Sequence, residues 1–328
     1  MRSSGRWKSC SHAASAAKRK EIRIMGKTVY MFPGQGAQYT GMGKEFYEQS
    51  QICKAVFDQA SSVTGLDIPA LCFEENEQLN ITEYTQIAML TVEAAIYKEM
   101  EQKKLKPDYA AGLSLGEYGA LIVSGALDTA DAFRIIRKRG IYMQEAVPTG
   151  GAMAAVLGLD ADAVETACAQ TEGTVSVANY NCPGQIVITG EQAAVEKAGE
   201  RCKAAGAKRM MPLKVSGPFH SKMLEPAGEK LAAEFDHVHI RSVAIPYVTN
   251  VTADFVTDET QIKDLLVRQI SSSVRWQQSV ERLIAEGADE FVEIGPGHTL
   301  SAFIKKIDRT VRVFHIEKPE DLENYVNR

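Results

Sequence analysis

The sequence predicts an α/β protein in which a mainly parallel sheet, covered by helices, is interrupted by a smaller unit. Two observations carry this prediction. From residue 25 onward, short apolar strands alternate with helical segments, which is typical of parallel sheets covered on both faces. Between residues 148 and 216 the order changes to βαββαβ. We therefore expect a core built from residues 25–147 and 217–328, with an insert at 148–216.

The first half of the expected core begins with an apolar strand that ends in Pro33-Gly34-Gln35-Gly36. Helical periodicity follows over residues 44–64 and again over 84–103. A short buried strand at 108–114 then runs directly into a helix that continues through residue 123. This half therefore supplies two strands, each followed by a turn that contains glycine.

The insert contains two helical segments, at 160–171 and 191–206. Strands are expected at 152–159 and 207–215, with two more within 174–190 on either side of Asn-Cys-Pro-Gly. This order is the split-βαβ, or ferredoxin-like, arrangement. An insert of this kind creates a cleft against the larger domain, and small ligands usually bind in such clefts.

The chain then returns to the pattern of the core. We expect a helix within residues 216–235, a strand at 245–253 and a helix at 279–287. The last strand that we expect covers 289–297 and ends in Gly-Pro-Gly.

Composition and charge exclude several classes of function. The 328 residues are 45% hydrophobic and 24% charged, as in ordinary soluble globular proteins. The net charge is −5, but residues 1–24 hold a charge of +6, which leaves the rest near −11. An acidic body gives no reason to expect nucleic-acid binding. No uncharged run reaches the ~18 residues of a membrane span, so we expect no membrane partner.

Residues 1–24 are basic, rich in Ser and Ala, and without apolar periodicity. A transit peptide has a similar composition, but a clean strand pattern begins at Met25, so we interpret the segment as a disordered leader or tag. The six cysteines lack a C-x-x-C pair, which predicts reduced thiols and a cytoplasmic location. His237 and His239 come nearest to a metal motif, but no third ligand is nearby, so we expect no metal site.

The strongest chemical signal is Gly112-Leu113-Ser114-Leu115-Gly116, a G-x-S-x-G motif between a strand and a helix. Such a turn forces the serine into strained backbone space, so only glycines fit two residues away on either side. The Ser114 hydroxyl then stands at a helix N-terminus, and the amide of Leu115 points toward a tetrahedral oxyanion. The alternative is an ordinary strand-to-helix turn built from small residues.

A serine nucleophile needs a base, and His220 is the first candidate because it leaves a strand through a Gly-Pro turn. His298 remains a second candidate, and a buried histidine satisfied by backbone is the alternative for His220. The Gly34-Gln35-Gly36 loop supplies a second oxyanion donor. That loop is no dinucleotide fingerprint, because Tyr39 stands where glycine is required.

Six segments together resemble the malonyl-CoA:acyl carrier protein transacylases of bacterial fatty acid synthesis, and also the acyltransferase domains of polyketide synthases. They are "MFPGQGAQYTGMG", "GLSLGEYGALIVSGAL", "RKRG", "NYNCPGQIVITG", "SGPFHSKMLEPA" and "EIGPGHTL". The resemblance runs from about residue 25 to about 315. It implies an α/β-hydrolase-like core with a ferredoxin-like insert.

The resemblance also implies catalytic roles. Ser114 becomes the nucleophile and His220 its general base. The backbone carbonyl of Gln269, seven residues before the Trp of "RWQQ", orients the histidine. The amides of Gln35 and Leu115 form the oxyanion hole.

Arg139, Asn181 and Phe219 are the substrate-binding residues that the resemblance implies. Arg139 grips the malonyl carboxylate, for which a guanidinium is suited because it can form two parallel hydrogen bonds. Its alternative is a solvated member of the basic run 134–139. Asn181 lies near the mouth of the site, and Phe219 favours malonyl over methylmalonyl. The family usually has histidine where this chain has Leu113, which affects hydrogen bonding and hydrolysis at the elbow.

These roles imply malonyl transfer from malonyl-CoA to the phosphopantetheine thiol of acyl carrier protein through a malonyl-serine. We expect a cytoplasmic monomer with no metal or other cofactor, whose partners are malonyl-CoA, CoA and, transiently, acyl carrier protein. Because acyl carrier proteins are acidic, a basic surface is expected, with Lys203, Lys208, Arg209 and Lys214 as its candidates. The alternative for these four residues is an ordinary solvated face.

Three alternatives stay open: a serine thioesterase or esterase, a polyketide synthase component, and a non-catalytic carrier-binding module. A hydrolase normally has an acid between serine and histidine. The acids in that interval, which we expect to lie at helix caps or on helix surfaces, are Asp128, Asp131, Asp160 and Asp162.

Overall fold

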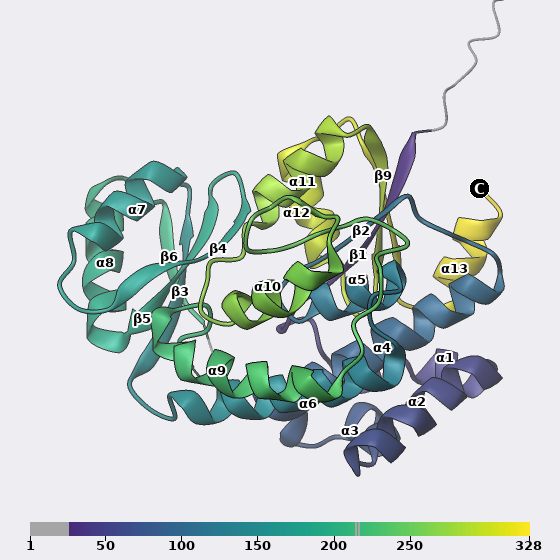
Figure 1. The fold of residues 1–328 in the computed structure, drawn as a ribbon. Helices are drawn as coiled ribbons and strands as arrows, with labels where there is room; N and C mark the ends of the chain where they lie inside the picture. The colour runs from purple at the N-terminus through teal and green to yellow at the C-terminus, as the bar shows by residue number, and fades with distance from the viewer. Residues whose placement is uncertain (1–25, 214, 216) are drawn as a thin grey trace, which may run out of the picture.

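A computed structural model describes residues 26–328 except 214 and 216. The expected leader at 1–24 and the proposed contact residue Lys214 therefore lie outside the described residues. Two sheets organise the fold, one in the larger lobe and one in the smaller lobe (Figure 1).

Among the described residues, six strands form the sheet of the larger lobe, in the order β10-β9-β1-β2-β7-β8. All neighbouring pairs are parallel except β7 and β8. The strands are β1 Lys27–Phe32, β2 Tyr109–Gly112, β7 Tyr247–Val248, β8 Phe255–Val256, β9 Ala288–Ile294 and β10 Arg312–Ile316. The mainly parallel sheet is confirmed, although 289–297 is not the last strand, because β10 follows it.

Helices cover both faces of this sheet. One side is packed by the helices α4 Thr82–Gln102, α5 Gly116–Ser124 and α6 Thr129–Ala146, and the other by α11 Trp276–Ala285 and α12 Thr299–Ile307. The remaining core helices are α1 Lys44–Gln49, α2 Gln51–Thr64, α3 Ile68–Phe73, α9 Glu225–Glu234, α10 Ile262–Gln269 and α13 Pro319–Val326.

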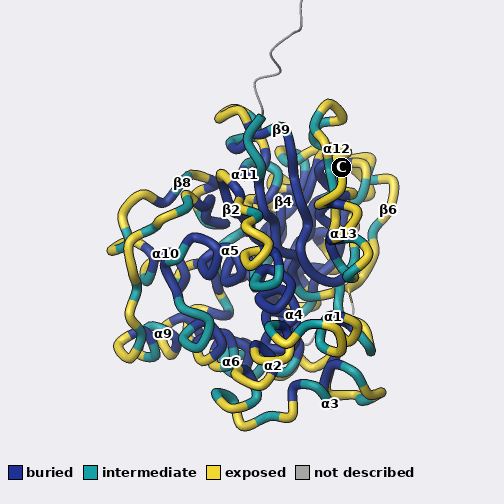
Figure 2. Tube along the Cα trace, turned by 90° about the vertical axis from the view of Figure 1, so that its right-hand side faces the viewer, coloured by how far each residue is buried: buried dark blue, intermediate teal, exposed yellow. Residues whose placement is uncertain are grey.

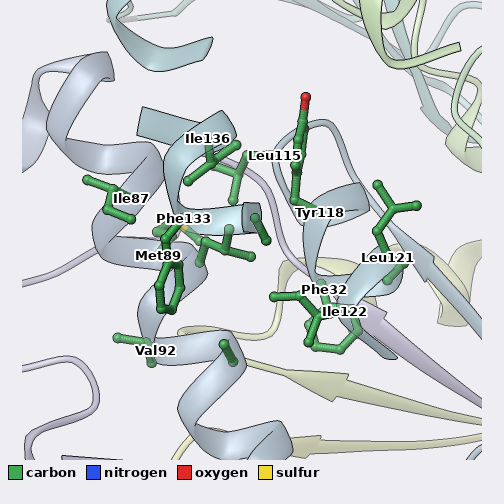
Figure 3. Close-up of a cluster of buried hydrophobic side chains, with 14 of the residues drawn as sticks. Phe32, Ile87, Met89, Val92, Leu115, Tyr118, Leu121, Ile122, Phe133 and Ile136 are labelled. Atoms are coloured by element: carbon green, nitrogen blue, oxygen red, sulfur yellow. The ribbon is translucent and has the colours of Figure 1, made fainter. Parts of the chain in front are cut away.

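The alternation of side chains along β1 explains this layering. Tyr30 and Phe32 belong to the apolar cluster with α4, α5 and α6, whereas Val29 and Met31 belong to the cluster with α11 and α12. In Figure 3, Phe32 lies beside Leu121 and Ile122 of α5. The strands β1, β2, β7 and β9 are largely buried, whereas β10 at the edge of the sheet is partly exposed (Figure 2). A central strand buried on both faces needs apolar residues at consecutive positions, as β1 has.

The helical pattern at 44–64 is two helices in the structure. Ser50 separates α1 from α2, and its side chain accepts a hydrogen bond from the Cys53 amide at 3.2 Å. A serine that caps a helix takes an extended backbone, which ends the preceding helix.

The smaller lobe follows the expected order β3-α7-β4-β5-α8-β6 along the chain. Its sheet is antiparallel, with the strand order β4-β5-β3-β6. The elements are β3 Gly151–Leu157, α7 Ala161–Ala169, β4 Val175–Cys182, β5 Gln185–Glu191, α8 Gln192–Ala204 and β6 Arg209–Pro212.

Hydrogen bonds join the smaller lobe to the larger one along β4. The amide of Val274 donates to the carbonyl of Ala178 at 2.8 Å, and the amide of Tyr180 donates to the carbonyl of Val274 at 2.9 Å. The Ser273 hydroxyl donates to the carbonyl of Val177 at 2.6 Å. The two sheets are therefore linked through the segment that precedes α11.

The junction between β2 and α5 has no room for a side chain on its glycines. A Cβ on Gly112 would lie 1.9 Å from the carbonyl oxygen of Gly116, and one on Gly116 would lie 2.1 Å from that of Phe32. Both obstacles are backbone atoms, so neither can move without shifting a strand or a helix.

We expect Gly116→Ala to lower the free energy of unfolding by about 3 kcal/mol or more, because the new methyl group overlaps the backbone of β1. Urea denaturation followed by circular dichroism measures this. Gly199→Ala on α8 is the matched control, because only the flexible end of Met210 lies near that position, at 3.1 Å. Similar unfolding midpoints for the two variants would show that the junction is not as tight as described.

Candidate active site

Ser114 stands on the sharp bend between β2 and α5. Its φ is 56°, in the left-handed region that non-glycine residues seldom adopt. Its peptide groups are held on both sides: the amide donates to Asn250 Oδ1 at 2.7 Å, and the carbonyl accepts from Gln269 Nε2 at 2.9 Å. The strained backbone that G-x-S-x-G predicts is present, and side chains from the turn after β7 and from the end of α10 stabilise it.

His220 lies against the Ser114 hydroxyl. Its Nε2 is 2.8 Å from Ser114 Oγ, and its Nδ1 is 2.9 Å from the backbone carbonyl oxygen of Gln269. Because a carbonyl can only accept, Nδ1 carries the proton and Nε2 is left to accept from the serine. The imidazole is thus oriented by a neutral carbonyl in the place where hydrolases use a carboxylate.

Burial sets the protonation state of His220. The side chain is buried, and this burial, together with the nearby charge of Arg139, lowers its pKa to about 4, although the hydrogen bond to Gln269 acts in the opposite direction. A histidine with a lowered pKa is neutral near pH 7, which is the form that can accept a proton.

Arg139 reaches the same hydroxyl from α6. Its Nη2 donates to Ser114 Oγ at 3.1 Å and to Gln269 Oε1 at 2.9 Å, and its Nη1 donates to Gln86 Oε1 at 2.6 Å. The guanidinium is completely buried, and burial lowers its pKa. Within the part of the chain that the structure describes, no carboxylate forms an ion pair with it. A buried cation with neutral partners has a strong attraction for an anion.

The two expected oxyanion donors both adjoin Ser114. Leu115 directly precedes α5, and Gln35 follows β1 in the loop that packs over the elbow. A Cβ on Gly34 would lie 2.7 Å from the Leu113 carbonyl oxygen, so this loop packs directly on the residue before Ser114 and leaves no space for a side chain at position 34. The Leu113 side chain also lies against Gly34 and gives this side of the elbow an apolar surface.

A cavity of about 230 Å³ opens onto these groups, between the two sheets. Asn181 and Phe219, the remaining predicted site residues, both line it. The larger lobe contributes Gly34, Gln35, Gly36, Ala37, Gln86, Leu113, Ser114, Leu115, Arg139, Met143, Phe219, His220, Thr299, Leu300 and Phe303, and the insert contributes Met153, Asn179, Asn181, Val187, Leu213 and Val215. The cleft expected between insert and core is therefore present.

The other candidates lie elsewhere. His298 is exposed and its ring lies 4.8 Å from that of His315. Asp128 caps α6 and Asp160 caps α7, as expected of the acids between serine and histidine. Within the described residues, no group of three or more His, Cys, Asp or Glu is arranged to hold a metal ion, and the cysteines are free and buried. No helix in the described part of the chain is long and apolar enough to cross a membrane.

Sequence reasoning missed Gln86, Asn250 and Glu117. Gln86 holds Arg139, and Asn250 holds the Ser114 amide. A signal for Asn250 existed, since it follows the strand that pairs with β2, and the carboxyl ends of parallel strands meet at one edge. No local pattern identifies Gln86, which lies in the long buried helix α4.

Comparisons with known proteins support one family. Residues 29–318 match the model of the acyl transferase domain. The malonyl CoA-acyl carrier protein transacylase of Bacillus subtilis is 46% identical over 304 residues, covering 91% of this chain and 96% of the relative. That of Escherichia coli is 43% identical over 300 residues, covering 90% and 97%.

Solved structures agree with these matches. MCAT from Streptococcus pneumoniae superimposes with a TM-score of 0.89 at 46% identity, over 92% of this chain and 99% of that chain. A malonyl-transacylase in complex with its type II PKS acyl-carrier protein gives a TM-score of 0.89 at 39% identity, with the same coverage.

We expect Ser114 to react with a fluorophosphonate at a rate that is nearly constant from roughly pH 5 to pH 8, because a pKa near 4 keeps His220 neutral over this range. Protonation of His220 removes the base only as the pH falls toward 4. Intact-mass measurement of labelling against time gives the rate, with His220→Ala as the unreactive control. A decline centred near pH 6.5 would contradict the buried environment described for His220.

Proposed function

The chain belongs to the acyl transferase family, and from this premise we propose that it transfers a malonyl group from malonyl-CoA to the phosphopantetheine thiol of an acyl carrier protein. One observation carries the proposal: a buried guanidinium without a carboxylate partner among the described residues lies 3.1 Å from the candidate nucleophile. The names of the relatives at 43–46% identity support the same activity.

In the first half-reaction, the Ser114 hydroxyl gives its proton to His220 Nε2 while Oγ attacks the thioester carbonyl carbon. The amides of Gln35 and Leu115 stabilise the resulting oxyanion. The carbon–sulfur bond then breaks, CoA leaves as a thiol that takes the proton from His220, and a malonyl ester of Ser114 remains.

In the second half-reaction, the thiol of the carrier protein gives its proton to His220 and its sulfur attacks the ester carbonyl. The carbon–oxygen bond breaks, and Ser114 Oγ recovers the proton from His220. No metal or organic cofactor takes part in these steps. The backbone carbonyl of Gln269 keeps Nδ1 protonated throughout, so one nitrogen serves as the base and then as the acid.

Arg139 gives the proposal its substrate class. The free carboxylate of a malonyl group can accept hydrogen bonds from the guanidinium, and each such charged bond contributes about 1.5–3 kcal/mol. An acetyl group has no acceptor there and leaves the cation unpaired. Phe219, in the same cavity, limits the space for a methyl branch and favours malonyl over methylmalonyl.

We place the acceptor's docking surface on the insert, at Lys203, Lys208 and Arg209. Lys203 lies near the end of α8 and Arg209 begins β6, whose chain continues to Leu213 in the cavity wall. These exposed basic side chains, on the lobe that contributes Leu213 to the cavity, suit an acidic carrier protein. In this proposal the protein acts as a cytoplasmic monomer. Its domains are an α/β-hydrolase-like domain, formed by residues 25–147 and 217–328, and a ferredoxin-like domain formed by residues 148–216.

The same chemistry serves fatty acid synthesis and polyketide synthesis. Because one similar structure is a malonyl-transacylase bound to a type II PKS acyl-carrier protein, a role in polyketide synthesis is the second candidate function. Hydrolysis is less well supported, because a neutral carbonyl orients His220 where a hydrolase has an acid.

Incubation with malonyl-CoA is expected to add one malonyl group to the wild-type chain and none to Ser114→Ala, as measured by intact mass. Addition of an acyl carrier protein should then remove the group and produce malonylated carrier faster than free malonate. Rapid release of malonate at the same rate with and without the carrier would indicate a thioesterase.

Arg139→Ala is expected to slow acylation by malonyl-CoA about 100-fold and to change acylation by acetyl-CoA by less than about 3-fold. Only the malonyl group has a carboxylate that can bind the guanidinium, so only malonyl transfer loses that interaction. Arg137→Ala is the control on the same helix, since Arg137 pairs with Glu83 outside the cavity. Equal losses with both thioesters would contradict the role assigned to Arg139.

A further inference from the structure

Glu117 lies beneath the nucleophile and has no place in the reaction described above. It is on α5, three residues after Ser114, and is completely buried. Its Oε2 accepts hydrogen bonds from Gln269 Nε2 at 2.7 Å and from the Asn250 amide at 3.1 Å. Burial of a carboxyl group is unfavourable and raises its pKa, here to about 7, so its retention calls for a reason.

Asn250 and Gln269, which donate to Glu117, both also hold Ser114. Asn250 accepts from the Ser114 amide through Oδ1 and donates to the Gly112 carbonyl through Nδ2 at 2.6 Å. Gln269 donates to the Ser114 carbonyl through Nε2. The carboxyl group thus supports, from one point, the two residues that clamp the strained backbone of the nucleophile.

Glu117 also dictates which way the Gln269 side chain faces. A primary amide has two protons on nitrogen, and Gln269 Nε2 uses them on Glu117 and on the Ser114 carbonyl. Its oxygen is therefore turned to Arg139 Nη2, at 2.9 Å. If the amide were reversed, its NH₂ group would face the guanidinium, donor against donor.

We propose that Glu117 is a positioning residue that fixes the Gln269 amide, and through it sets both the geometry of Ser114 and the aim of Arg139. The inference rests on the proposed function, since the aim of Arg139 matters only for a substrate with a free carboxylate. Acceptor oxygens, more than negative charge, are what this role requires. A glutamine in place of Glu117 retains an oxygen for Gln269 and Asn250.

The experiment compares Glu117→Ala, Glu117→Gln and wild type in single-turnover acylation by malonyl-CoA and acetyl-CoA, followed by intact mass. Glu117→Ala is expected to slow malonyl acylation about 100-fold and acetyl acylation about 10-fold, because two buried donors lose their acceptor but only malonyl depends on Arg139. The malonyl preference therefore falls about 10-fold. Glu117→Gln should stay within about 3-fold of wild type.

Glu290→Gln serves as the control. Glu290 is also a buried glutamate, but its partners are Arg312, Tyr325 and Arg328, away from the cavity. It is expected to lower the unfolding midpoint without changing the ratio of the two acylation rates. A loss of folded protein reduces the labelled fraction for both thioesters equally, so it leaves that ratio unchanged.

If Glu117→Ala does not fold, Gln269→Leu tests the same link, because it removes the amide while the backbone carbonyl that binds His220 remains. It should reproduce the loss of malonyl preference. Equal slowing of acylation by both thioesters in Glu117→Ala would overturn the inference. Where Glu117→Ala is unfolded, the same result in Gln269→Leu would overturn it. A large loss of activity in Glu117→Gln would also contradict it. Failure of the proposed function appears separately, as a wild-type chain that malonyl-CoA does not acylate.

Discussion

The left-handed backbone of Ser114 is the constraint on which the site depends. A residue with a side chain pays about 1–3 kcal/mol to stay in such a conformation, and it does so only where its surroundings leave no alternative. Here the surroundings are the close contact of Gly112 with Gly116 and the clamp from Asn250 and Gln269. The bend brings the hydroxyl out of the sheet and to the tip of α5. His220 and Arg139 are arranged around that fixed point.

The electrostatics of the site follow from placing a buried cation and a buried base side by side. The guanidinium of Arg139 and the imidazole of His220 both lie within hydrogen-bonding distance of one hydroxyl oxygen. The positive charge disfavours a second one nearby, so it helps to keep the imidazole neutral. The hydrogen-bond partners of Arg139 are neutral oxygens, so the same charge remains available to an incoming anion. One buried cation therefore affects both the protonation of the base and the choice of acyl group.

Much of the fold and of the site can be predicted from the sequence, and there are physical reasons why some site residues and elements cannot. Ser114 could be recognised because the crowding between Gly112 and Gly116 arises within five consecutive residues, so the sequence motif records it directly. The parallel sheet and the smaller lobe could be predicted from the order of strands and helices along the chain. Asn250, Gln86 and Glu117 escaped notice, because their roles come from strand order and helix packing rather than from neighbours in the chain. The break at Ser50 and the strand β10 were also missed, since a capping serine and a half-exposed strand give weak periodicity.

The hydrogen bonds between β4 and the segment before α11 have a consequence for ligand exchange. Many two-lobed enzymes admit and release ligands by rotating one lobe about a hinge. Here such a rotation would break main-chain bonds at Ala178 and Tyr180 beside the cavity itself. These bonds hold β4, which supplies Asn179 and Asn181 to the cavity wall, against the segment before α11. Under the proposed function, we expect donor and acceptor to reach Ser114 in turn while these main-chain bonds stay intact, through the flexible arms that carry their thiols.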